Sequence, residues 1–129
     1  MRVFATKWFT RFARKERITD RQLSEAIQKA ERGSIDADLG GGVIKQRVAR
    51  AGAGRSGGYR TLIAYRALQR GVFLYGFAKN ERGNIDDDEL ASLKRLAKRL
   101  MNLTDDEIEK SLEGNELREL NYHGEDEEG

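Results

Sequence analysis

The sequence has no cysteine and only one histidine, His123, among its 129 residues. Without cysteine the chain forms no disulfide and offers no thiolate ligand to a metal. The lone histidine has no partner motif, which argues against histidine-based acid–base chemistry and against Ser/His/Asp or Cys/His triads. No apolar run approaches the roughly 18 residues of a membrane span. The N-terminal segment at residues 1–4 is too short for a signal peptide. We therefore expect a cytoplasmic protein with no membrane contact.

Charge is distributed unevenly along the chain. The formal net charge is only +2, but residues 1–84 hold 18 Lys and Arg against 7 Asp and Glu, whereas residues 85–129 hold 6 against 15. A basic body with an acidic tail is typical of proteins that bind nucleic acid, and such a tail can screen the basic face. The length suits one domain with a modest core. We expect that domain at residues 1–114, followed by an acidic, disordered tail at residues 115–129.

Four stretches carry helix signals. The first helix, expected at residues 7–16, has one apolar face that we assign to the core: Trp8, Phe9, Phe12 and Ala13. Three further helices each begin with a capping box inside a hydrophobic staple, at Thr19, Asp86 and Thr104. The acids of residues 86–89 stand in a first helical turn, where they offset the helix dipole. We therefore assign them to capping and expect no metal site.

The remaining elements are strands. Residues 43–82 contain three β-rich runs joined by turns, the pattern of an antiparallel meander. A short strand is also expected at residues 3–6, and the three glycines of residues 40–42 indicate a flexible break before the sheet. The order β-α-α-β-β-β-α-α predicts an α+β domain. Its small, twisted antiparallel sheet would pack against the N-terminal helices on one face, with one or two C-terminal helices.

Positive charge is concentrated in the predicted meander. Residues 43–82 hold one acid, Glu81, and nine cations: Lys45, Arg47, Arg50, Arg55, Arg60, Arg66, Arg70, Lys79 and Arg82. Like charges on adjacent strands repel one another, and a bound polyanion would neutralise them. The sequence therefore predicts a sheet that binds the phosphates of a nucleic acid.

Strand alternation narrows the set of candidates. Lys45 and Arg47 are two residues apart and so project from the same face of a strand; the alternative for this pair is a solvated strand face. Arg60 stands at the start of the second run, where it can point across the same sheet. Lys79 ends the third run. For the other strand arginines, Arg66 and Arg70, ordinary surface charge is the stronger interpretation.

A glycine-rich motif and three tyrosines add no firm functional assignment. Residues 52–57 match the dinucleotide-binding fingerprint, but a β-rich run follows instead of a helix, and no acid stands about 20 residues on. We interpret this match as chance and expect a hairpin loop that brings Arg55 near phosphate. The three tyrosines of the meander are either core or base-stacking residues, and alternation alone does not decide between these: Tyr59, Tyr65 and Tyr75.

A basic face without histidine can still cleave RNA. A lysine crowded by arginines can accept the 2′-OH proton, because nearby positive charge lowers the pKa of a lysine. The arginine fork suits phosphate oxygens, and a tyrosine or a second cation can protonate the leaving oxygen. This chemistry uses no metal and no cofactor. It is restricted to RNA because DNA lacks the 2′-OH.

Three segments, in this order and spacing, resemble a known family: KQRVAR at residues 45–50, GGYR at 57–60 and FAKNER at 77–82. They are similar to the RelE/HigB toxins of bacterial type II toxin–antitoxin systems, within the RelE/ParE superfamily, and the likeness covers roughly residues 1–101. The resemblance implies a RelE-like fold and an endoribonuclease, or mRNA interferase, that cleaves mRNA in the ribosomal A site and so inhibits translation. It also implies a cognate antitoxin protein as a partner.

The family's catalytic basic groups, carried over by motif, fall on Lys45, Arg47, Arg60 and Lys79, with Arg82 as a further match. We assign Lys45 as general base, Arg47 and Arg60 as phosphate clamps, and Lys79 to substrate placement or leaving-group protonation. RNA-binding roles are assigned to three other arginines: Arg50, Arg55 and Arg82.

Two departures from the family and two rival functions stand beside this assignment. The family's late catalytic tyrosine has no clear equivalent, since Tyr122 lies in the predicted tail, and the acidic extension after about residue 103 exceeds the family core. The first rival is a binding toxin of ParE type that acts on DNA gyrase without cleaving RNA. The second is an inactive toxin that serves as co-repressor of its antitoxin on operator DNA.

Overall fold

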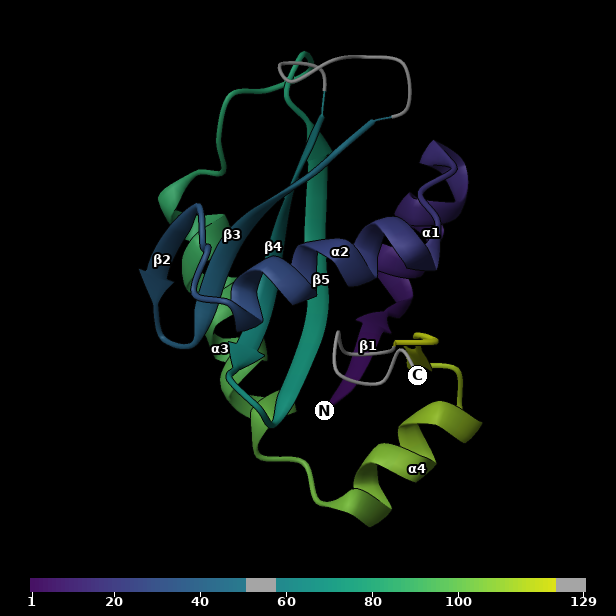
Figure 1. Ribbon diagram of the computed structural model, residues 1–129. Coiled ribbons are helices and arrows are strands. Elements are labelled where there is room, and N and C mark those ends of the chain that lie inside the picture. The colour runs from purple at the N-terminus through teal and green to yellow at the C-terminus, as the bar shows by residue number, and fades with distance from the viewer. Residues whose placement is uncertain (51–57, 123–129) are drawn as a thin grey trace.

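The computed structural model describes residues 1–50 and 58–122. The strands are β1 (Arg2–Thr6), β2 (Ala37–Gly40), β3 (Val43–Val48), β4 (Tyr59–Arg66), β5 (Arg70–Ala78) and β6 (Leu117–Glu119), and the helices are α1 (Lys7–Glu16), α2 (Asp20–Glu31), α3 (Asp87–Met101) and α4 (Asp105–Glu113) (Figure 1). The predicted α+β class is confirmed. Within the described ranges, none of the helices is both long and apolar enough to span a membrane.

The strands form one mixed sheet in the order β2-β3-β4-β5-β1-β6. The predicted antiparallel meander is confirmed as β3, β4 and β5. The expectation of a wholly antiparallel sheet is wrong, because β1 pairs with β5 in parallel. The chain reaches the rest of the sheet from β1 only after α1 and α2, and such a crossover is what a parallel pair requires. Strands β2 and β6, at the two edges, were not predicted.

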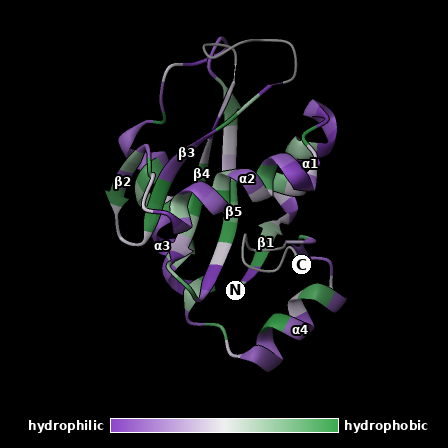
Figure 2. Ribbon diagram, in the orientation of Figure 1, coloured by the Kyte–Doolittle hydropathy of each residue, from purple (hydrophilic) through white to green (hydrophobic). Residues whose placement is uncertain are grey.

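Helices cover both faces of the sheet, not one face as predicted. Helices α1 and α2 lie in front of the strands in Figure 1, and α3 lies behind them. The central strands explain this arrangement, since Leu62 and Ile63 are adjacent on β4, point to opposite faces and are both fully buried. Ile63 belongs to the core under α1 and α2, and Leu62 to the core under α3. A strand buried on both faces is nearly continuous in apolar residues, and Figure 2 shows hydrophobic residues concentrated along the central strands.

All three predicted capping boxes are confirmed. The side chains of Thr19, Asp86 and Thr104 accept hydrogen bonds from the backbone N–H groups three residues on, at 3.2, 2.8 and 3.2 Å. The reciprocal bonds to the cap backbone are also present in each case. The acids at residues 86–89 therefore begin α3, as the sequence predicted.

The three glycines of residues 40–42 lie at the turn of the β2–β3 hairpin, with Gly40 as the last residue of β2. Gly40, Gly41 and Gly42 all have left-handed φ values, of 81°, 61° and 80°. Only glycine adopts this conformation without strain at successive positions. The run that was expected to be a break before the sheet is therefore a turn within it.

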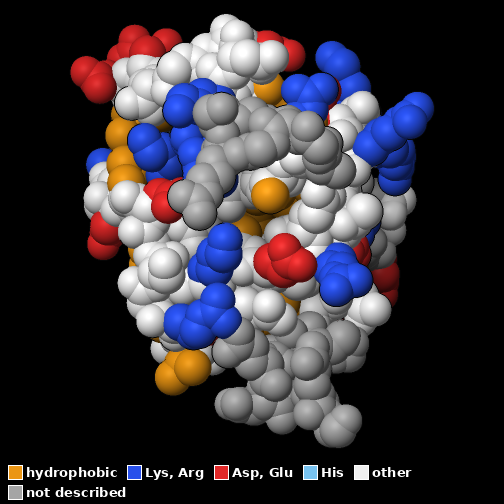
Figure 3. Space-filling model, turned by 45° about the horizontal axis from the view of Figure 1, so that its top comes forward, with side chains coloured by type: hydrophobic (Ala, Val, Ile, Leu, Met, Phe, Trp, Pro, Cys, Tyr) orange, Lys and Arg blue, Asp and Glu red, His pale blue; other side chains and the backbone are white. Residues whose placement is uncertain are grey.

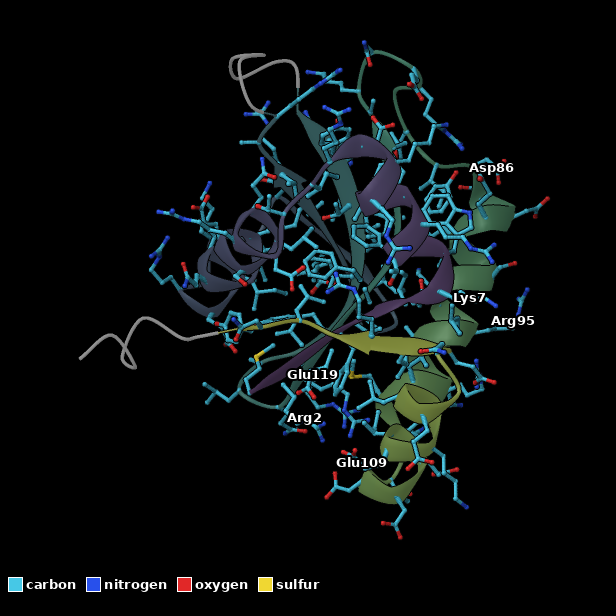
Figure 4. All side chains as sticks on the ribbon, turned by 90° about the vertical axis from the view of Figure 1, so that its right-hand side faces the viewer. Arg2, Lys7, Asp86, Arg95, Glu109 and Glu119 are labelled. Atoms are coloured by element: carbon cyan, nitrogen blue, oxygen red, sulfur yellow. The ribbon has the colours of Figure 1, made fainter. Side chains whose placement is uncertain are left out.

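Part of the segment assigned to the acidic tail lies in the sheet. Strand β6 pairs antiparallel with β1. Leu117, its first residue, is buried in the core under α3, and Leu120, which follows the strand, is buried in the core under α1 and α2. Arg2 on β1 donates to both carboxylate oxygens of Glu119 at 2.8 Å and to Glu109 on α4 at 3.1 Å (Figure 4). The predicted boundary at residue 114 remains a prediction. The expectation of disorder is wrong for residues 115–122, which the structure describes and which include β6, whereas residues 123–129 lie outside the described ranges.

Arg70 is a structural residue, not an ordinary surface charge as predicted. It begins β5, and its guanidinium donates to the backbone oxygens of Leu100 and Leu103, at 2.8 and 3.1 Å. The Leu100 oxygen lies in the last turn of α3, where the final carbonyls lack helical partners and the helix dipole favours a cation, and Leu103 follows the end of the helix.

Candidate nucleic-acid interface

The register of the meander brings three of the predicted basic residues onto one face of the sheet. Arg47 on β3 lies directly opposite Arg60 on β4, and Lys45 lies opposite Leu62. Directly opposed residues project to the same side, with Cβ atoms about 4.5–5.5 Å apart. The two rows continue onto β5, where Leu62 is opposite Tyr75 and Arg60 is opposite Phe77.

Helix α3 covers only part of this face. Val43 on β3 is fully buried in the core beneath α3, whereas Lys45 and Arg47, the next residues on the same side, are half-buried. Ile44 and Val48, between and beyond them, point into the opposite core. The face therefore opens toward the end of the sheet where β3 and β5 finish and β4 begins. Figure 3 turns this end forward, and Lys and Arg side chains gather around it.

Arg60 is a half-buried arginine on this face. Its Nη1 atom is buried and has no hydrogen-bond partner among the described residues. An unpaired buried donor costs about 1–3 kcal/mol, and more when it is charged. The nearest cross-strand neighbour, Arg47, carries the same charge and cannot accept a hydrogen bond. An anion bound between the two guanidinium groups would satisfy the orphaned donor and reduce the repulsion.

Lys79 lies at the same end of the sheet. It directly follows β5, is exposed, and its backbone N–H donates to the oxygen of Gly58 at 3.3 Å. Gly58 precedes β4, and a Cβ atom there would lie 2.7 Å from the backbone oxygen of Val48. Only glycine permits this close approach, which keeps the ends of β3, β4 and β5 together.

Arg82 is held by protein contacts, although the sequence assigned it to RNA. Its guanidinium forms a bidentate ion pair with Glu89 on α3, at 2.6 and 3.1 Å, and donates to the backbone oxygen of Asn84 at 2.8 Å. It also donates to the hydroxyl of Tyr75 at 3.3 Å and lies over the ring of Phe77. The hydrogen bond from Arg82 lowers the pKa of Glu89 to about 2. Arg82 thus fixes the segment after β5 against the start of α3.

Of the other two residues predicted to bind RNA, the structure describes Arg50. Arg50 lies over the ring of Tyr59, 5.8 Å from its centroid, and Tyr59 belongs to the core under α1 and α2. Burial, followed by a hydrogen bond with Glu16 on α1, raises the pKa of that tyrosine. Arg50 therefore lies toward the opposite face. Arg55 and the whole glycine-rich fingerprint, residues 52–57, lie outside the described residues.

The structure also separates the tyrosines. Tyr65 donates to Glu31 on α2 at 2.8 Å, and burial followed by that bond raises its pKa. Tyr122 packs against the same core, so it is placed on the face of α2 and not beside Lys45. Of the three meander tyrosines, only Tyr75 shares the face of the cations.

Trp8 is partly outside the core, contrary to the prediction from helix periodicity. It is 46% exposed and stacks on Tyr75, with ring centroids 4.5 Å apart. Strand β1 pairs with β5 only as far as Phe73, so the next part of β5 has an open side against which the start of α1 packs. Sequence analysis missed the pairing of Trp8 with Tyr75, because it depends on contacts between α1 and a distant strand.

The sequence was compared with models of known protein families. The model of one family, described as the RelE toxin of the RelE/RelB toxin–antitoxin system, matches residues 1–120. The match spans β1 to β6 and every candidate basic residue named above. A comparison with curated proteins found no match.

Proposed function

The chain belongs to the RelE toxin family and is the toxin of a toxin–antitoxin system, and from this premise we propose that it is a ribosome-dependent mRNA endonuclease that inhibits translation. The observation that supports cleavage is the open basic face, where Arg60 has a buried donor without a partner beside Arg47. Family membership supports the ribosome as the place where mRNA is presented, and a cognate antitoxin is the expected protein partner.

The proposed reaction is an internal transesterification of RNA. Lys45 accepts the proton of a 2′-OH, and the 2′-oxygen attacks the adjacent phosphorus. Arg47 and Arg60 bind the non-bridging oxygens and stabilise the charge that develops on the pentacovalent phosphate. The bond from phosphorus to the 5′-oxygen breaks, and that oxygen takes a proton from Lys79. The products are a 2′,3′-cyclic phosphate and a 5′-hydroxyl.

The position of the cations suits this division of roles. Arg47 and Arg60 face each other across one pair of strands, so two guanidinium groups can contact one phosphate. Lys45 stands one row away on the same strand face, on the side toward α3. Lys79 stands beyond Arg60 at the end of β5. A scissile phosphate bound between the arginines would therefore have a lysine on either side.

The test is induction of the chain in a bacterial host, with transcriptome-wide mapping of mRNA 5′ ends. We expect cuts within translated codons and growth arrest, and we expect both to be lost in the double variant Lys45→Ala/Arg60→Ala. Removing one preorganised charge contact costs roughly 10²–10³ in rate. The matched control is Arg21→Ala/Lys110→Ala, which removes two exposed cations on α2 and α4 and should leave both effects intact.

The rival functions give different results in the same experiment. Growth arrest that persists in the soluble Lys45→Ala/Arg60→Ala variant would refute the assignment of these residues. DNA damage with intact mRNA would favour the gyrase-binding alternative. Neither arrest nor cleavage by the wild type would favour an inactive toxin that acts as a co-repressor.

A further inference from the structure

Trp8 is an exposed aromatic residue that the proposed reaction does not use. Among the described residues, the large hydrophobic side chains that are exposed are Met1, Trp8 and Leu68, so Trp8 is the aromatic member of that set. Its indole N–H donates no hydrogen bond within the described ranges, so an available donor accompanies the exposed side chain. Tryptophan carries a large apolar area and usually buries most of it. Nearly half of this side chain instead faces solvent.

The exposed indole lies on the β5 side of the cross-strand row that also contains Lys45. Trp8 stacks on Tyr75, and Tyr75 is in register, through Leu62, with Lys45 two strands away. Neighbouring strands are about 4.7–4.9 Å apart, so the backbone of Tyr75 lies roughly 10 Å from that of Lys45. The cations of β3 and β4 and the aromatic pair of β5 and α1 therefore lie on the same side of the sheet, with the buried Leu62 between them.

The aromatic side is held rigidly. Arg82 donates to the Tyr75 hydroxyl and is itself fixed by Glu89. Phe12 stacks on Trp8 with centroids 5.4 Å apart, and it lies so close to β5 that a Cβ atom on Gly76 would be 2.7 Å from its ring. Ordering Trp8 therefore costs little further entropy when a ligand binds, as expected of a preformed site.

We propose that Trp8, supported by Tyr75, is a base-stacking platform that takes an unpaired base of single-stranded RNA while the cations hold its phosphates. The inference rests on the proposed function and adds a second part to the same interface. Single-strand binders combine positive charge along the backbone with aromatic rings under the bases. Stacking of this kind tolerates any base, since every base has a π-face, and so it adds affinity without sequence preference.

The chain offers a direct probe, because Trp8 is its only tryptophan. The full-length protein is titrated with a short 2′-O-methyl RNA, which cannot be cleaved by attack of its own 2′-oxygen. Tryptophan fluorescence reports contact with Trp8, and the anisotropy of a dye on the oligonucleotide reports binding. We expect quenching that saturates with the anisotropy. An abasic oligonucleotide with the same number of phosphates should bind more weakly and leave the fluorescence unchanged.

Variants separate stacking from phosphate binding. Trp8→Ala should lose roughly 5- to 150-fold in affinity for the oligonucleotide with bases, the range expected for one stacked base, and little for the abasic one. Trp8→Phe keeps a ring and should retain much of the affinity, which also shows that the fold is intact. Leu68→Ala, which truncates an exposed hydrophobic side chain elsewhere, is the matched control and should change neither value.

The outcomes are distinguishable from failure of the proposed function. Anisotropy that shows binding while fluorescence and the affinity of Trp8→Ala stay unchanged would overturn the stacking inference and leave the cationic interface standing. Binding by no oligonucleotide at low salt would overturn both. Equal losses for oligonucleotides with and without bases would mean that Trp8 acts only by supporting the fold, which also overturns the inference.

Discussion

At the scale of single residues, the like charges of the basic face lower the stability of the free protein. Arg47 and Arg60 are directly opposed on neighbouring strands, an arrangement that is destabilising for like charges. One donor of Arg60 is buried without a partner in the described structure. This arrangement is consistent with the proposed site, because a bound anion would offset the local cost.

Glu89 shows the opposite arrangement, a carboxylate that is fully engaged. Its pKa in the folded chain is about 2, against 4.5 for the free side chain, chiefly because Arg82 donates to it. A folded pKa below the unfolded one means that the charge stabilises the fold above about pH 4.5. That contribution is lost as the pH falls toward 2.

We predict that Glu89→Gln lowers the free energy of unfolding at neutral pH, and that the difference from the wild type shrinks as the pH falls from 4.5 to 2. Glutamine keeps a side-chain oxygen at this capping-box position, so the change isolates the charge. Urea unfolding at a series of pH values measures the effect. The control is Asp87→Asn, which changes a carboxylate of the same helical turn that forms no ion pair among the described residues, and it should lower the free energy of unfolding at neutral pH by less. A constant difference at every pH would contradict the prediction.

Local chemistry made part of the basic face predictable from sequence. The spacing of Lys45 and Arg47 fixes their common face through strand alternation alone, and the structure places Arg60 on that face as expected. The engagement of Arg82 and the exposure of Trp8 were not predictable in this way. Each depends on a contact with a distant element, Glu89 on α3 in one case and Tyr75 on β5 in the other.

At the scale of elements, the helices were predictable from local signals, whereas the edge strands depend on distant contacts. The capping boxes at Thr19, Asp86 and Thr104 are local signals read within four residues, and all three helices begin where they predict. The edge strands β2 and β6 have four and three residues. Segments so short carry too little alternation to be recognised, and their pairing with β3 and β1 decides their conformation.

The β2–β3 turn gives a test of backbone conformation that is free of packing effects. Gly42 has a φ of +80°, and a Cβ atom there would meet nothing within 4 Å. Gly42→Ala should therefore cost about 1–2 kcal/mol of stability through the left-handed conformation alone. Gly83 also has open space around it but no left-handed φ, so Gly83→Ala should change stability by less than about 0.5 kcal/mol. Equal urea midpoints for the two variants would contradict this account of the turn.

At the scale of the whole molecule, charge is segregated between the two ends of the chain. The basic face is built from β3, β4 and the end of β5, whereas the last 45 residues carry 15 of the 22 acids. Some of these acids are engaged within the fold, as Glu109 and Glu119 are by Arg2. Residues 123–129 add four more acids and no lysine or arginine. Their negative charge opposes the approach of a polyanion wherever they lie within a Debye length of the basic face.

Removing residues 123–129 should therefore strengthen RNA binding at low salt. The truncation takes away four acids and shifts the formal net charge from +2 to +6, while it leaves β6, Leu120 and Tyr122 in place. Affinity for a non-cleavable oligonucleotide should rise severalfold in dilute salt. The gain should vanish near 1 M salt, where the Debye length is about 3 Å. A full-length variant with Glu125, Asp126, Glu127 and Glu128 changed to their amides should reproduce the gain, because charge and not chain length is the cause. If the truncated chain and the amide variant both bind as the wild type does, these acids do not screen the interface, and the asymmetry of the sequence has no part in how this toxin meets RNA.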